Sequence, residues 1–103
     1  MAFSDKAEYK VPRHIVQPGG VNVEAISSNR TLTYKDAQYQ RLDAQSGSLE
    51  VILPAEKDGA MFVINCQGNA FTVKDAAGTT VKALSLGEGG MFCCDGSAWK
   101  QFL

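Results

Sequence analysis

The sequence has little of the chemistry on which most enzymes depend. Its 103 residues include one histidine, His14, and three cysteines, and Cys66, Cys93 and Cys94 form an odd set without a Cys-x-x-Cys spacing. A disulfide framework and a zinc site are therefore not expected, and the cysteines are interpreted as reduced, small apolar side chains. In an extended strand Cys93 and Cys94 point to opposite faces, because successive side chains alternate.

Neither sign of charge dominates, and long apolar runs are missing. Ten Lys and Arg residues against eleven Asp and Glu residues give a formal net charge of -1, which argues against a nucleic-acid partner because phosphate backbones demand a basic surface. No stretch approaches the ~20 apolar residues that cross a bilayer, and the charged first ten residues lack the apolar core of an export signal. We expect no membrane partner and synthesis in the cytoplasm of a cell.

No arrangement of residues predicts catalysis or metal binding. His14 has no nucleophile or carboxylate near it in the sequence, whereas acid and base catalysis needs such pairs. Asp58, Asp75 and Asp95 each stand at a turn, where an aspartate bonds its own backbone. The glycines at 87, 89 and 90 lead into a strand, although phosphate-binding loops open a helix. We expect no enzyme activity, no catalytic residue, no cofactor and no metal.

Aromatic residues offer one possible ligand site. Trp99, Tyr34 and Tyr39 could together form a face that stacks on a carbohydrate or a base. A single Trp in a small β domain more often packs in the core or across strands. The packing interpretation is therefore preferred for Trp99.

Short apolar runs separated by glycine-bearing turns make up most of the chain. Hydrophobic residues are 45% and charged residues 20% of the sequence, as in ordinary globular domains, and the length suffices for one modest core. The glycine-bearing breaks fall at Gly47, Gly59, Gly68, Gly78, Gly87 and Gly96. Turn signals at roughly 8–12-residue spacing predict an all-β fold, an antiparallel β-sandwich or small barrel of about seven or eight short strands.

The apolar runs predict strands at residues 31–34, 39–44, 49–53, 61–66, 71–74, 80–84, 91–94 and 98–102. The run 61–66 is apolar on both faces, which is typical of a central strand. Turns at 67–69, 75–78 and 95–96 predict hairpins, so that sequential strands pair antiparallel. Thr33 and Asp36 form a pair that also resembles a helix cap, but no helical stripe follows, and strand, turn, strand is preferred.

Residues 1–28 differ from the rest and are interpreted as an extended N-terminal arm, followed by one β domain over residues 29–103. The arm holds two of the three prolines, which disfavour a helix or a central strand. A short edge strand is expected at 21–26. Tyr9, Val11, Ile15 and Val16 are the candidate partner contacts; the alternative is a terminus that contacts nothing.

Five segments set the turns and core positions of the β domain: Thr31-Leu32-Thr33 with Asp36, Leu53-Pro54-Ala55, residues 59–65, residues 71–78, and residues 94–99. Their order resembles a pattern in small virion proteins of tailed bacteriophages, of the capsid decoration or cement type. The resemblance implies a structural protein without catalytic residues, and residues 1–28 lie outside it.

The resemblance leaves two placements in the virion open. A tail fibre is usually a long multidomain chain, whereas we expect from Met1 a complete short chain. The resemblance therefore implies a homo-oligomeric decoration protein, dimer or trimer, that binds the major capsid protein at subunit junctions and stabilises the expanded head. The alternative is a tail-associated or receptor-binding module that contacts host glycan or another tail protein through an exposed aromatic face.

Overall fold

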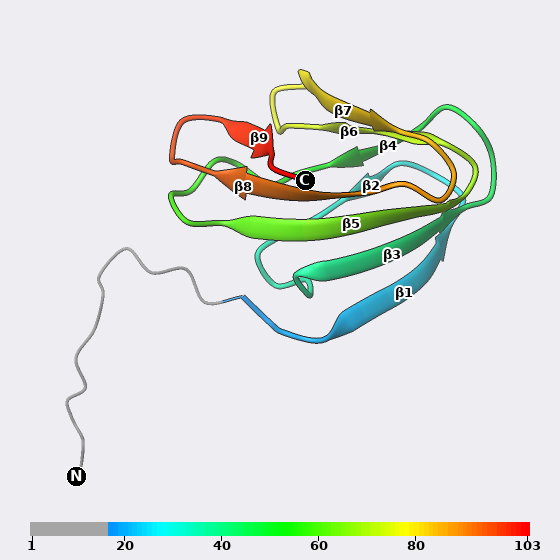
Figure 1. Ribbon diagram of the computed structural model, residues 1–103, viewed down its shortest axis with the longest axis horizontal. Helices are drawn as coiled ribbons and strands as arrows, with labels where there is room; N and C mark the ends of the chain where they lie inside the picture. The colour runs from blue at the N-terminus through cyan, green and yellow to red at the C-terminus, as the bar shows by residue number, and fades with distance from the viewer. Residues whose placement is uncertain (1–16) are drawn as a thin grey trace, which may run out of the picture.

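Figure 1 shows the computed structural model, which describes residues 17–103. These residues form nine strands and no helix, so none of them lies in a helix that could cross a membrane. The strands are β1 (Val21–Ile26), β2 (Arg30–Thr31), β3 (Tyr39–Ala44), β4 (Leu49–Ile52), β5 (Met61–Gly68), β6 (Phe71–Lys74), β7 (Thr80–Leu84), β8 (Gly89–Cys94) and β9 (Trp99–Gln101). The all-β prediction is confirmed, and each predicted strand overlaps an observed one.

The strands form two mixed sheets, and the chain alternates between them (Figure 1). The first sheet has the order β1-β3-β5-β8-β9, and the second has the order β2-β4-β6-β7. Up to β6 the chain makes three coils, β1–β2, β3–β4 and β5–β6, which stack in parallel in both sheets. The chain then reverses, because β7 pairs antiparallel with β6, β8 with β5 and β9 with β8.

The prediction of a purely antiparallel fold is wrong, because four of the seven strand pairs are parallel. The turn at 67–69 in particular closes no hairpin, since β5 and β6 belong to different sheets. This corner lies against the preceding coil: Asn69 donates from its backbone N and from Nδ2 to Ala44 O, at 3.1 and 3.0 Å. A turn signal fixes the local bend but not the strand that the chain meets next.

Two other predicted hairpins, β6–β7 and β8–β9, are confirmed. In the first turn Asp75 Oδ1 accepts hydrogen bonds from the backbone N of Ala77 and Thr79, at 3.0 and 2.8 Å. In the second, Asp95 Oδ1 accepts one from Ser97 N at 3.0 Å. The two aspartates therefore have the turn role that the sequence predicted. The central position of β5 and the edge position of β1 are also as predicted.

One hydrophobic core draws side chains from both sheets. Its most deeply buried members are Phe62, Phe92, Leu32, Leu42, Leu53, Ile64, Leu84, Val51, Val73 and Cys66. Because β1 contributes Ile26 to this core, the expected edge strand at the end of the arm is part of the folded domain. Full burial of a large apolar side chain contributes about 1.5–3 kcal/mol, so this core is the main source of stability.

The core ends at the first coil in a polar layer. Asn22 and Glu24 occupy the inward positions of β1, whereas the next two strands place Leu42, Ile64 and Cys66 there. Arg30 donates from Nε to Glu24 Oε1 at 3.1 Å and from Nη2 to Asp36 Oδ1 at 3.2 Å. A polar outer face of this kind is how stacked coils end a hydrophobic core.

Candidate interaction surface

An apolar row crosses the outer face of the first sheet, which is turned away from the core. Val21, Tyr39, Val63 and Met91 are successive register partners on β1, β3, β5 and β8. Leu103 continues the row, since Met91 N donates to Leu103 O at 2.9 Å. Val21 is 63%, Tyr39 54% and Leu103 77% exposed. Contiguous exposed apolar patches are typical of contact surfaces, so this row is the candidate interaction surface.

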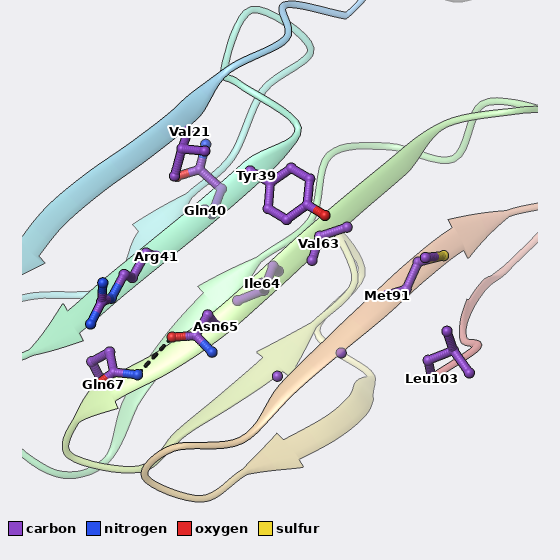
Figure 2. Close-up of a pocket in the computed structure, with 12 residues that line it drawn as sticks. Val21, Tyr39, Gln40, Arg41, Val63, Ile64, Asn65, Gln67, Met91 and Leu103 are labelled. Carbon is purple, nitrogen blue, oxygen red and sulfur yellow. Dashed lines mark hydrogen bonds between the residues drawn. The ribbon is translucent and has the colours of Figure 1, made fainter.

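A groove of about 640 Å³ follows this row (Figure 2). It is lined by Val21, Tyr39, Gln40, Arg41, Val63, Ile64, Asn65, Gln67, Gly89, Gly90, Met91 and Leu103. Polar side chains gather at one end, where Gln67 Nε2 donates to Asn65 Oδ1 at 2.7 Å. Arg41 has no ion-pair partner within residues 17–103. An apolar centre with polar groups at its margin is the usual composition of a protein interface.

The floor of the groove over β8 is bare backbone at Gly89, which lies on the same face of the strand as Met91 and has no side chain, whereas Gly90 is turned toward the core. A Cβ on Gly89 would lie 3.2 Å from Ile64 O, and one on Gly90 would lie 3.1 Å from the Phe92 ring. Both glycines therefore sit where neighbouring groups approach closely. They open strand β8, as the sequence predicted, and not a helix that could bind phosphate.

The N-terminal segment enters the fold next to the start of β5. Gln17 Oε1 accepts a hydrogen bond from Met61 N at 3.1 Å, and Pro18 O accepts one from Gln38 N at 3.1 Å. These two contacts fix the point from which the chain leads to β1. The predicted partner contacts lie outside the described residues and stay a prediction: Tyr9, Val11, Ile15 and Val16.

The three aromatic candidates do not share one face. Trp99 is 5% exposed and donates from Nε1 to Pro54 O at 2.9 Å, so the packing interpretation is confirmed. Tyr34 donates its hydroxyl to Ala55 O, and burial raises the pKa of Tyr34 to about 12. Of the three, Tyr39 alone lies on the outer face of the first sheet.

Of the remaining candidates, the cysteines belong to the folded domain. Cys94 is buried and Cys93 is half-buried on the outer face, so their predicted opposite orientation is confirmed, and all three thiols are free. Burial raises the pKa of the Cys66 and Cys93 thiols. Within residues 17–103 no three His, Cys, Asp or Glu side chains are placed to hold a metal ion. His14 lies outside the described residues.

Sequence reasoning did not identify the apolar row as a site. Its one signal was the run 61–66, apolar on both faces, which was interpreted as a central strand only. The structure shows why both faces are apolar: Phe62 and Ile64 face the core, and Val63 faces the groove. No known protein family, curated protein sequence or solved structure matches this chain.

Proposed function

We propose that this chain is a structural virion protein of a tailed bacteriophage, a capsid decoration protein on the capsid surface. It binds at junctions between major capsid protein subunits as a homo-oligomer and stabilises the expanded head, without a cofactor or a catalytic step. Its two sheets are then the layers of a sandwich built from coils. The observation that carries this proposal is the apolar row on the outer face of the first sheet.

Docking on the head lattice covers this row. Full burial of a large apolar side chain contributes about 1.5–3 kcal/mol. Tyr39, 54% exposed, is the aromatic member of the row, and Leu103, 77% exposed, is its most exposed member. One copy binds weakly through such a strip, but linked copies bind together with much higher avidity. A protein that binds only the assembled lattice stabilises that lattice by mass action.

The polar end of the groove favours a second function. The Tyr39 ring lies in the same groove as Arg41, Asn65 and Gln67 (Figure 2), and an apolar ring beside a few convergent polar groups is typical of a small-ligand site. A tail-associated or receptor-binding module would hold host glycan here. The capsid proposal accounts for more of the surface, because a glycan at this end leaves Leu103 unused.

Co-sedimentation with expanded empty heads of the parent phage tests the proposal. Tyr39→Ser removes the one aromatic side chain of the row, and Leu86→Ser is the matched control, because Leu86 is 61% exposed between β7 and β8. Interface tyrosines are often hot spots, so Tyr39→Ser should weaken head binding about tenfold or more, while Leu86→Ser binds as the unaltered chain does.

Failure takes two forms. If the unaltered chain does not co-sediment, or if both variants bind equally, the capsid proposal is rejected. If Tyr39→Ser keeps head binding but loses binding on a glycan array, the receptor-binding function replaces it.

A further inference from the structure

The outer face of the first sheet changes from apolar to polar along its strands. Beside the apolar row lies a second row of register partners, which holds Val23, Arg41, Asn65 and Gly89. On β1, β3 and β5 the two rows are two residues apart, about 6.6 Å. A partner that covers the apolar row therefore has Arg41 and Asn65 at its margin.

Arg41 is the one ionised side chain among the described residues that line the groove. It is exposed, and it forms no ion pair within residues 17–103. Asp43, the next acid along β3, lies over Gly68 and lines a neighbouring hollow of about 470 Å³ that Arg41 shares. A guanidinium without a carboxylate partner suits an acidic group, because it binds carboxylates with two parallel hydrogen bonds.

Asn65 adds a second donor at the same margin. Its Oδ1 accepts a hydrogen bond from Gln67 Nε2 at 2.7 Å (Figure 2), which leaves Nδ2 as the amide group for a partner. In the part of the chain that the structure describes, no acceptor contacts Nδ2. This nitrogen lies 3.4 Å from the Cβ position of Gly89, so the absence of a side chain there leaves the donor open. Both β3 and β5 thus present donors beside the apolar row.

We propose that the groove binds an extended, acidic segment of the major capsid protein. Three strand spacings of about 4.8 Å separate Val21 from Met91, about 14 Å in all, which is the length of about four or five extended residues. Apolar side chains of the segment cover the row, one carboxylate accepts from the Arg41 guanidinium, and Asn65 Nδ2 donates to a carboxylate or main-chain oxygen. The inference rests on the proposed function for the identity of the partner.

A peptide array that tiles the major capsid protein of the parent phage tests the proposal with the purified full chain. The unaltered chain should bind peptides in which apolar residues flank an Asp or Glu, and about tenfold or more weakly when that acid is replaced by its amide. Arg41→Gln should cause an equal loss. The two changes together should cost little more than one, because both remove the same ion pair.

Two further variants complete the test. Lys82→Gln is the matched control, since it removes the same charge from an exposed position on β7 of the second sheet, and it should bind as the unaltered chain does. Asn65→Asp should weaken binding of the acidic peptides, because it replaces a donor by a like charge. Far-UV circular dichroism checks that each variant is folded.

Three results would overturn the proposal: no bound peptide, bound peptides without an acid, or equal binding by Arg41→Gln and Lys82→Gln. Binding on a glycan array that Arg41→Gln abolishes, with no bound peptide, would assign the groove to the receptor-binding function instead. Head binding is measured separately. A chain that binds heads but no acidic peptide loses this inference alone, and a chain that binds acidic peptides but no heads loses the capsid function alone.

Discussion

Replacing Gly68 by alanine probes the stacking of the coils at one corner. Gly68 is the last residue of β5 and has a φ of 76°. An added Cβ would meet Asp43 Oδ1 at 2.2 Å and Ala44 O at 2.4 Å. The Asp43 side chain can rotate away, but the Ala44 carbonyl is backbone and accepts two hydrogen bonds from Asn69. Relief of the clash therefore requires one coil to move against the other.

Two separate costs apply to this substitution. A left-handed backbone costs a non-glycine residue about 1–2 kcal/mol, and forcing extra atoms into a packed site costs about 1–3 kcal/mol. Gly68→Ala should therefore lower the free energy of unfolding by about 2–5 kcal/mol. Gly78→Ala isolates the first cost, because Gly78 has a φ of 92° and no atom lies within 4 Å of its Cβ position. We expect about 1–2 kcal/mol there.

Urea unfolding, followed by Trp99 fluorescence and far-UV circular dichroism, measures both variants. The reasoning requires Gly68→Ala to be clearly the less stable of the two, with the slope of the transition unchanged. If both variants lose the same free energy within about 0.5 kcal/mol, then the corner does not press on Ala44. The parallel stacking of β5–β6 on β3–β4 would then be refuted.

Three further substitutions test individual contacts. Trp99→Phe leaves the Pro54 carbonyl without its hydrogen-bond donor, so urea unfolding should show that the free energy of unfolding falls by about 1–3 kcal/mol. An unchanged midpoint of unfolding would contradict a stabilising role of this bond. Burial alone would raise the pKa of Asp36, but hydrogen bonds from Thr33 and Arg30 outweigh burial and lower that pKa. The ionised Asp36 therefore stabilises the fold above about pH 3.9, the ordinary pKa of an aspartate. This stabilisation is lost as the pH falls through the lowered pKa of Asp36. Asp36→Asn should remove this acid loss in melting curves, and an unaltered acid profile would contradict the role of the carboxylate. Burial raises the pKa of Tyr34 to about 12, so stability should fall as the pH rises from about 10 to about 12, and Tyr34→Phe should lack this decline.

Local patterns predicted the strands well. The predicted bounds match the observed ones at both ends for the strands at 39–44, 71–74 and 80–84. Alternating side chains indicate burial on one face of a strand, and this signal is local. The Thr33 and Asp36 pair, which could have begun a helix, is a turn in which Asp36 Oδ2 accepts from Thr33 N at 2.7 Å. Turn chemistry and strand periodicity are both local, and both can therefore be read from a single sequence.

Strand partners and the candidate interaction surface were not predictable in this way. Gly68 carries the same signal in a hairpin turn and in a coil corner, and only the approach of Ala44 distinguishes them. The apolar row joins Val21, Tyr39 and Met91, which are far apart in the sequence and meet only through the sheet register. Such a surface depends on pairing, which a sequence alone did not supply.

Hydroxyl-radical footprinting of head-bound against free protein tests the central claim most directly, because it reports which side chains are covered. Tyr39 and Met91 lie on the proposed contact face, and Leu86 lies outside it. We predict strong protection of Tyr39 and Met91 on bound copies, with Leu86 oxidised as in the free chain. Protection of Leu86 with Tyr39 and Met91 left reactive would contradict the assignment of the outer face of the first sheet as the binding surface.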